Sequence, residues 1–262
     1  MAYGEPTDPR AGLVSVTFRA LPPDRVASLA AAAGLAGIEW GGDVHVPHGD
    51  LAAARRVRRW TVDAGLAVAS YGSYWRAGDA APGEGPDPDA VLSTAEALGA
   101  PHVRVWAGRQ GSADCPEDLR RRIAEDLAAF AASAAVRGLA VSLEYHGGTL
   151  TDTAASALRL LDEAGAPGLR LYWQPLGGRT PDERAADLAQ VAPRLSNLHV
   201  YQWAGDERRP LAEGGAEWTR YLRIARGTGA PGWALLEFVR GDDPARLAED
   251  AAALRSWLET EG

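Results

Sequence analysis

Segment 141–148, VSLEYHGG, places a glutamate and a histidine two positions apart in a β-strand that enters a loop. Successive side chains of a strand alternate between its faces, so Glu144 and His146 share one face and apolar residues share the other. A solvent-exposed polar face would explain this pattern in an isolated strand. The alternative is an active site, and the polar groups of the other strands decide between the two.

Three later apolar runs carry a polar group at an equivalent position near their C-terminal ends: Gln174, His199 and Glu237. Together with Glu144 they form a set of carboxylate, imidazole and amide donors. This set suits Mn²⁺, Mg²⁺ or Co²⁺, and Zn²⁺ less clearly. A hydrogen-bonded polar cluster without metal is the alternative. Two facing carboxylates in a low-dielectric site need a proton or a cation between them, which favours one divalent metal ion.

These residues require an element pattern that brings strand ends together. Short apolar runs alternate with alanine- and arginine-rich segments of helical spacing, which is typical of βαβ units. Strands are expected at 13–18, 37–40, 67–71, 102–106, 141–146, 169–174, 197–202 and 233–239. Helices are expected at 23–33, 50–64, 87–99, 117–137, 154–165, 181–192, 216–228 and 244–259.

Eight βα units without a composition break predict an α/β fold, a single (β/α)₈ TIM barrel over residues 1–262. Residues 1–11 are expected to form a flexible N-terminal segment. An open doubly wound sheet is the alternative, but no Gly-x-Gly-x-x-Gly follows the first strand. The longer irregular stretches at 72–86, 107–116 and 203–215 follow strand ends, where the active-site loops of a barrel lie.

In a barrel, one face of each strand contacts the helices and the other faces the lumen. We expect the helix-facing sets to be Val14/Val16/Phe18, Ile38/Trp40, Val103/Val105, Leu143/Tyr145, Leu171/Trp173, Leu198/Val200 and Leu236/Phe238. The expected lumen sets are Ser15/Thr17, Glu39, Arg104/Trp106, Glu144/His146, Tyr172/Gln174, His199/Tyr201 and Glu237. So many inward polar groups favour an active site over a solvent-exposed polar face.

Arg104 is an inward-pointing cation among these residues. Arg104 and Glu39 either form a structural ion pair or contact an anionic or polyhydroxy substrate. His45 is a further candidate for substrate contact, whereas Pro47 argues against a helical ligand pair with His48. We expect His102 to be structural. Aromatic residues near strand ends could line a binding site or pack the core; they are Tyr71, Tyr74, Trp75 and Trp106.

Composition excludes several functional classes. The formal net charge of −8 argues against an extended nucleic-acid interface and favours small-molecule substrates. No apolar run approaches the roughly 20 residues of a membrane span, and the first residues lack an export signal, so we expect a cytoplasmic protein. All 27 basic residues are arginine, which removes lysine chemistry, and the single Cys115 cannot form an internal disulfide.

The order of Glu, amide, His and Glu on the last four strands resembles the xylose isomerase-like superfamily of TIM barrels. The resemblance rests on GIEW at 37–40, EYHGGTLTDT at 144–153, NLHV at 197–200 and LEFV at 236–239. It implies that Glu144 and Glu237 are paired metal ligands that also exchange protons with a bound sugar. It also implies that His146 binds substrate. The family usually has aspartate where YWQP offers Gln174, which leaves the site one negative charge poorer.

The resemblance implies a divalent-metal-dependent isomerase or epimerase of a sugar, keto-sugar or related polyol, acting through an enediolate. A dehydratase or lyase would share the first step, and a catalytically silent binding barrel is a further alternative. Endonuclease IV belongs to the same superfamily but needs many histidines and a cationic surface, whereas this chain has five histidines. A homo-oligomer is compatible with the sequence.

Overall fold

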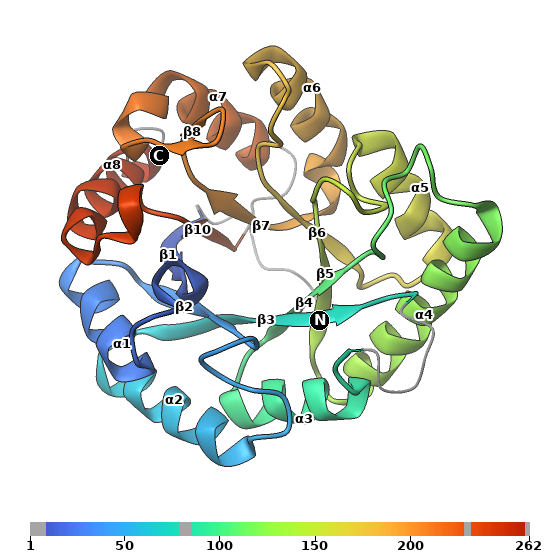
Figure 1. The fold of residues 1–262 in the computed structure, drawn as a ribbon, viewed down its shortest axis with the longest axis horizontal. Coiled ribbons are helices and arrows are strands. Elements are labelled where there is room, and N and C mark those ends of the chain that lie inside the picture. Colours follow the sequence, from blue (N-terminus) through green and yellow to red (C-terminus); the bar gives the residue numbers. More distant parts are fainter. Residues whose placement is uncertain (1–8, 79–84, 228–231, 260–262) are drawn as a thin grey trace.

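Eight parallel strands close into a barrel, and eight helices surround it (Figure 1). The computed structural model describes residues 9–78, 85–227 and 232–259. The barrel strands are β1 (Arg10–Val14), β2 (Gly37–Gly41), β3 (Ala67–Arg76), β4 (His102–Trp106), β5 (Ala140–Glu144), β6 (Arg170–Trp173), β7 (Leu195–Val200) and β10 (Trp233–Leu236). This architecture confirms the TIM barrel.

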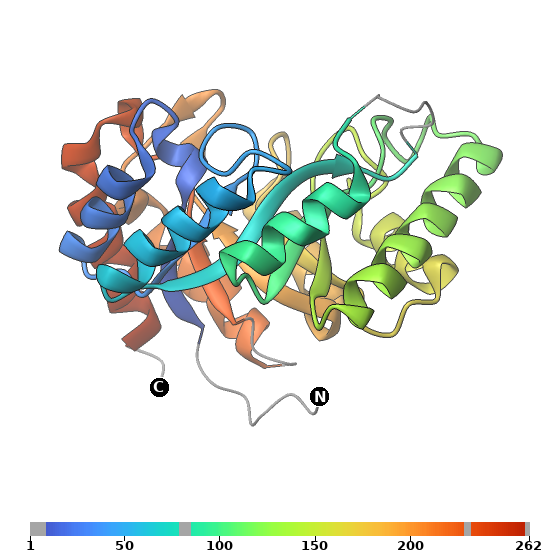
Figure 2. The same ribbon diagram turned by 90° about the horizontal axis from the view of Figure 1, so that it is seen from below.

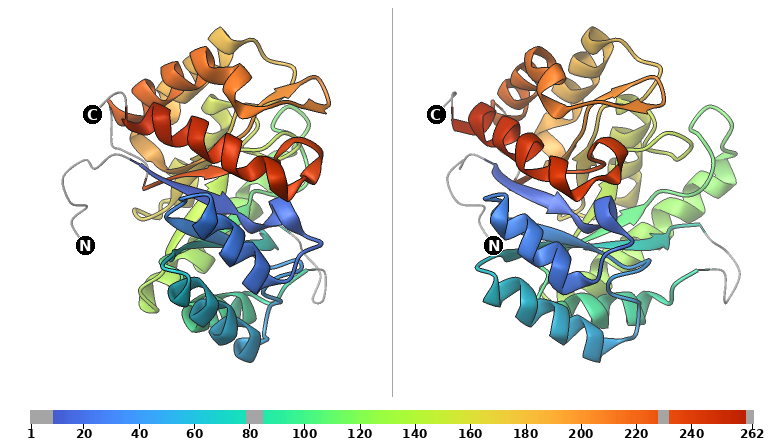
Figure 3. Two further views of the ribbon diagram at one scale, coloured as in Figure 1. Left: turned by 90° about the vertical axis from the view of Figure 1, so that its left-hand side faces the viewer. Right: turned by 60° about the vertical axis from the view of Figure 1, so that its left-hand side comes forward.

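Each strand is followed by a helix on the outside of the barrel. The helices are α1 (Pro23–Ala32), α2 (Leu51–Asp63), α3 (Pro88–Leu98), α4 (Glu117–Val136), α5 (Ala154–Ala164), α6 (Pro181–Val191), α7 (Gly215–Arg226) and α8 (Leu247–Glu259). Strand β1 pairs with both β2 and β10, which closes the sheet. Helix α8 accordingly lies beside α1, as Figure 3 shows in red and blue.

Local sequence signals account for the helix boundaries. The side chains of Asp50, Asp87 and Thr153 each accept a hydrogen bond from a backbone N–H in the first turn of the following helix. Thr180 and Glu183 form a reciprocal capping box at the start of α6. These caps satisfy backbone donors that a helix leaves free at its start.

The predicted element boundaries differ from the observed ones at several strand ends. Strand β3 continues to Arg76, into the stretch expected to be irregular, and the strands expected to end at 146 and 239 end at Glu144 and Leu236. Residues 15–18 form a 3₁₀ helix (Ser15–Phe18) instead of continuing the first strand. Arg10 and Ala11 belong to β1, so the expectation of a flexible segment is wrong at these positions, while residues 1–8 lie outside the described part. The predicted helix 216–228 is α7, and its last position, 228, also lies outside the described residues.

One element of the loop after β7 was not predicted. Strands β8 (Trp203–Ala204) and β9 (Glu207–Arg208) pair antiparallel as a short hairpin. Figure 2 shows this hairpin in orange beyond the ends of the barrel strands. It therefore lies at the end of the barrel where the strands finish.

Among the described residues, no helix is long and apolar enough to cross a membrane.

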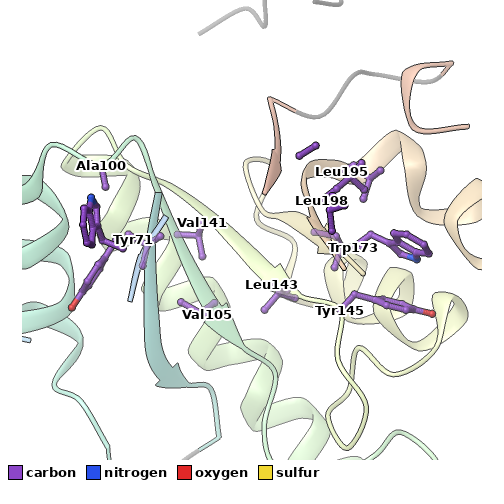
Figure 4. Close-up of a cluster of buried hydrophobic side chains, with 14 of the residues drawn as sticks. Tyr71, Ala100, Val105, Val141, Leu143, Tyr145, Trp173, Leu195 and Leu198 are labelled. Atoms are coloured by element: carbon purple, nitrogen blue, oxygen red, sulfur yellow. The ribbon is translucent and has the colours of Figure 1, made fainter. Parts of the chain in front are cut away.

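The larger hydrophobic core lies between the barrel and the helices. Outward-facing residues such as Val105, Leu143 and Leu198 belong to it, and Figure 4 shows part of this layer. A smaller apolar cluster fills the barrel interior; its members are Val14, Val16, Ala69, Tyr172, Trp233 and Leu235. The predicted helix-facing positions of Val14 and Val16 are therefore wrong.

Gly37 illustrates how tightly the interior of the barrel is packed. A Cβ at this position would lie 2.5 Å from Cη2 of Trp233 and 2.8 Å from the carbonyl oxygen of Ala67. We expect Gly37→Ala to lower the free energy of unfolding by about 1–3 kcal/mol through overpacking. Urea denaturation measures this, with Gly168→Ala as the control because no described atom lies within 4 Å of the place that its methyl group would take. Equal stabilities of the two variants would contradict this packing.

Candidate active site

A cavity of about 500 Å³ opens at the C-terminal ends of the strands. Three of the four predicted metal ligands line it: Glu144, Gln174 and Glu237. The other lining residues come from strand ends, from the segments that follow them and from the start of α6; they are Val16, Arg19, Tyr74, Arg104, Trp106, His146, Pro175, Gly177, Gly178, Arg184, Tyr201, Gln202, Trp203, Gly205, Asp206 and Phe238. The sequence-predicted polar groups thus converge where TIM-barrel active sites lie.

Arg104 organises one side of the cavity floor. Its Nε donates to Oε1 of Glu39 at 2.8 Å, and its Nη1 contacts the carboxylate of Glu144. The structure therefore confirms the predicted ion pair with Glu39 and adds a second partner. Gln174 Nε2 donates to Oε1 of Glu144 at 3.2 Å. The Thr151 hydroxyl donates to the backbone carbonyl of Glu144, which fixes the end of β5.

Buried charges in this network shift each other's pKa. Burial alone would raise the pKa of Glu39, but the Arg104 guanidinium and His199 outweigh it and hold this carboxyl well below its usual range. Burial likewise opposes the charge of Arg104, yet Glu144 and Glu39 raise its pKa further above the usual value. Glu39 and Arg104 thus form a charged pair, with Arg104 in the lining of the cavity and Glu39 buried beneath it.

His199 lies beneath the floor between two carboxylates. Its Nε2 is 3.5 Å from Oε1 of Glu39, and its Nδ1 is 3.6 Å from Oε2 of Glu237. The side chain is fully buried, and neither nitrogen has a hydrogen-bond partner in the described structure. Burial alone would lower the pKa of His199, but Glu237 and Glu39 raise it above the usual value.

Glu237 has a strongly perturbed carboxyl group. Burial raises its pKa to about 7, and the negative charge of Glu144 adds to the effect, although His199 opposes it. Perturbed carboxyls of this kind in a cavity are typical of functional sites. Glu237 is therefore able to hold or release a proton near neutral pH.

The donors fit a divalent cation in type and in charge. When ionised, the three buried carboxylates carry two more negative charges than the Arg104 guanidinium can balance; they are Glu39, Glu144 and Glu237. The unpartnered nitrogens of His199 are further donors. Within the described residues, no three His, Cys, Asp or Glu side chains are already grouped to hold a metal ion. Binding would thus require Glu144 to exchange part of its contact with Arg104 for the ion.

His146 and Trp106 form the wall beside Glu144. Their ring centroids are 4.4 Å apart. His146 Nδ1 donates to the carbonyl of Gly147 at 2.6 Å, because a carbonyl oxygen only accepts. In the neutral ring, Nε2 is then left to accept a hydrogen bond from a substrate hydroxyl. Both side chains line the cavity, which is where residues that contact substrate are expected.

Three residues predicted to contact substrate lie elsewhere, and one of them is Glu39, which is fully buried and does not line the cavity. Tyr71 is fully buried in the layer between barrel and helices, and its hydroxyl donates to the carbonyl of Val46 at 2.8 Å (Figure 4). His45 bonds Ser15 Oγ at 2.9 Å and the carbonyl of Leu21 at 3.1 Å, so both ring nitrogens are occupied. Neither side chain lines the cavity. On β3, Tyr74 reaches the cavity instead.

The wall opposite Trp106 was predicted only in part. Tyr201 was expected in the lumen, but the predicted helix-facing position of Phe238 is wrong, because its side chain lines the cavity, and Trp203 was not assigned. The wall consists of Tyr201, Trp203 and Phe238, which contact one another with ring centroids 5.7 to 6.2 Å apart. Phe238 has a φ of +61°, which is unusual for a residue other than glycine. Its backbone N–H donates to Thr17 Oγ1 at 3.2 Å. The long loop 203–215 after a strand end was the available signal.

Comparison with known proteins places the chain in a family. A curated 3-dehydroshikimate dehydratase of Bacillus anthracis is 36% identical over 69 residues, which is 26% of this chain and 25% of that protein. The crystal structure of a probable 3-DHS dehydratase from Bacillus anthracis matches with a TM-score of 0.77 at 21% identity, covering 94% of this chain and 98% of that one.

Two further solved structures share the fold. A TIM-barrel protein from Mycobacterium smegmatis in complex with magnesium has a TM-score of 0.76 at 18% identity, covering 99% of each chain. An L-ribulose 3-epimerase has a TM-score of 0.71 at 18% identity, covering 96% of this chain and 95% of that one. The family model described as xylose isomerase-like TIM barrel matches residues 27–259. The chain belongs to the xylose isomerase-like TIM barrel family.

Proposed function

We propose that the protein is an isomerase or epimerase of a sugar, keto-sugar or related polyol. The observation that carries this proposal is the pair of buried carboxylates, Glu144 and Glu237, on the floor of one cavity. They differ in environment, since the Glu144 carboxylate contacts the guanidinium of Arg104 while burial raises the pKa of Glu237 to about 7. Such a pair provides one group to accept a proton and another to return it.

The residues of the chain divide the proton transfers between them. Glu144 removes the proton from the carbon between a carbonyl and a hydroxyl, which leaves an enediolate. Glu237 returns a proton, either to the other face of the same carbon or to the neighbouring carbon. The first outcome is epimerisation, and the second is aldose–ketose exchange. His146 Nε2 accepts a hydrogen bond from a substrate hydroxyl and orients the ring.

One divalent metal ion completes the proposed site. Its ligands would be Glu144, Gln174, His199 and Glu237, with Mn²⁺, Mg²⁺ or Co²⁺ preferred over Zn²⁺. The bound cation would supply positive charge that stabilises the enediolate oxygens. The charge balance of the floor supports this choice, and so does the magnesium complex of the structurally similar Mycobacterium smegmatis protein.

A dehydratase is the second candidate. It is favoured by the sequence match to a 3-dehydroshikimate dehydratase, although that match covers only a quarter of either chain. The first step would be the same proton removal, followed by loss of a neighbouring hydroxyl as hydroxide. Product analysis separates the two reactions after the shared step has been detected.

The shared step is tested by incubation of the protein in D₂O with a panel of ketoses, inososes and hydroxy-keto acids. We expect NMR to show deuterium at the carbon next to the carbonyl of at least one compound. Removal of metal by a chelator should lower the exchange rate more than tenfold, and Mn²⁺ should restore it. A binding barrel without activity would incorporate no deuterium from any compound, with or without added metal.

A further inference from the structure

The cationic side chains around the cavity are neutralised by acidic partners. The arginines that line the cavity are Arg19, Arg104 and Arg184, and Arg179 lines an adjoining cavity. Arg19 pairs with Asp43 at 2.7 Å, and Arg179 pairs with Asp187 at 3.1 Å.

The two remaining arginines are also engaged. Arg184 donates from Nε to the carbonyl of Leu176 at 2.9 Å and lies 3.5 Å from Glu217. Arg104 pairs with Glu39 and Glu144. With lysine absent from the chain, no unpaired ammonium or guanidinium group of the described residues lines the cavity. A phosphate or carboxylate that left water for this site would find no unpaired side-chain cation there, which is costly.

One wall of the cavity presents a braced aromatic ring. Trp106, at the end of β4, lines the cavity. The guanidinium carbon of Arg76, which does not line the cavity, lies 3.9 Å from the centroid of the Trp106 ring. His146, two residues after the end of β5, contacts the same ring. The ring is thus held in place before any ligand binds.

A second aromatic wall faces the first across the barrel. In the strand order β1-β10-β7-β6-β5-β4-β3-β2, three strands separate β4 from β10 in either direction, so these two strands are diametrically opposed. Phe238 follows β10, and Trp203 packs against it. The guanidinium carbon of Arg208 lies 4.7 Å from the Phe238 ring and 5.5 Å from the Trp203 ring, which braces this wall in the same manner.

The backbone of Phe238 is held in a strained conformation next to Glu237. Its positive φ places the ring in the cavity wall directly after the perturbed carboxylate, and Thr17 holds the N–H. Strained residues of this kind persist at sites where the geometry serves binding or catalysis. This observation indicates that the position of the Phe238 ring matters to the site.

We infer that the substrate is an uncharged cyclic polyol or keto-sugar whose ring lies between Trp106 and Phe238. This inference rests on the proposed function and narrows its substrate class. The C–H faces of the ring pack on the aromatic side chains, as apolar surface does in binding sites. The hydroxyl and carbonyl groups on its edge meet the polar floor of Glu144, Gln174 and Glu237. Phosphorylated and carboxylated analogues should be poorer substrates.

Pairs of compounds that differ mainly in charge test the inference. Deuterium exchange is measured with a neutral ketose and its phosphate ester, and with the neutral methyl ester of 3-dehydroshikimate and 3-dehydroshikimate itself. We expect kcat/KM to be at least tenfold higher for the neutral member of each pair. Higher values for the anionic members would overturn the inference and leave the proposed reaction intact. Exchange with neither class would overturn the proposed function itself, and this inference with it.

Variants of the first wall test the position of the ring. Trp106→Ala is expected to raise KM for the neutral cyclic substrate about tenfold, and Trp106→Phe should recover most of this loss because it restores an aromatic face. Trp60→Phe is the control, because Trp60 is exposed on the outer helix α2. Phe238→Ala is the second test, from the opposite wall. An unchanged KM in both Trp106→Ala and Phe238→Ala would overturn the inferred placement.

Discussion

Replacement of Glu237 by glutamine is expected to lower turnover by about 10² to 10⁴-fold, because the amide cannot accept or return a proton. The fold should persist, since glutamine is nearly isosteric and removes a buried carboxyl whose charge is costly at this position. Turnover is measured on the substrate identified by deuterium exchange, and circular dichroism checks the fold. A variant with at least a third of wild-type turnover would exclude Glu237 from proton transfer.

The same substitution should change how stability depends on pH. In the metal-free protein the pKa of Glu237 is raised from 4.5 to about 7, so the folded state binds this proton more tightly than the unfolded state. The free energy of unfolding therefore falls as pH rises through this interval. Glu237→Gln removes the dependence. Urea denaturation in the presence of a chelator, at pH values from 4.5 to about 7, should show the variant gaining stability relative to the wild type.

Arg104→Met is expected to lower the free energy of unfolding by about 3–5 kcal/mol, because it leaves two buried carboxylates without their cation. Glu39 is fully buried and Glu144 nearly so. Arg104→Lys should also be destabilising, since an ammonium group cannot reproduce the fork that joins both carboxylates. Chemical denaturation at pH 7 measures both effects.

Two control variants distinguish the effect of breaking this buried ion network from the effect of replacing any arginine. Arg122→Met removes an exposed pair with Asp118 and should cost less than about 1 kcal/mol. The double variant Arg104→Met/Glu39→Gln should recover part of the loss, because one unpaired charge disappears with its partner. If Arg104→Met is no more destabilising than Arg122→Met, the buried network does not stabilise the fold.

The side-chain alternation of the polar strands made the cavity floor predictable. Each of β2, β4, β5 and β7 carries a polar residue between apolar neighbours, so Glu39, Arg104, Glu144 and His199 could be assigned to the interior from the sequence. The alternation of eight short apolar runs with segments of helical spacing was sufficient to predict the barrel itself.

Strands β1 and β3 gave no comparable indication of which face points inward. Both faces of β1 are apolar, so the inward position of Val14 could not be distinguished from the outward position of Leu13. The β2–β3 pairing shifts register between Ile38 and Glu39, and this irregularity depends on tertiary contacts. Tyr71 was therefore assigned to the substrate site although it faces the helices.

The aromatic wall was hidden for a different reason. Trp203 and Phe238 meet through a short hairpin and a positive φ, neither of which follows from hydrophobic periodicity. The charge state of the floor was also unpredictable, because it depends on distances among side chains from strands far apart in the sequence. The contact of Arg104 with Glu144, in addition to Glu39, is the clearest example.

The most direct test of the account compares deuterium incorporation by the metal-loaded wild type and by the double variant Glu144→Gln/Glu237→Gln, with one neutral cyclic ketose in D₂O. If Glu144 and Glu237 transfer the protons, the wild type incorporates deuterium at the carbon next to the carbonyl. The double variant, folded as judged by circular dichroism, then incorporates none above the uncatalysed rate. Equal incorporation by the two proteins would contradict the assignment of this carboxylate pair as the proton-transfer groups.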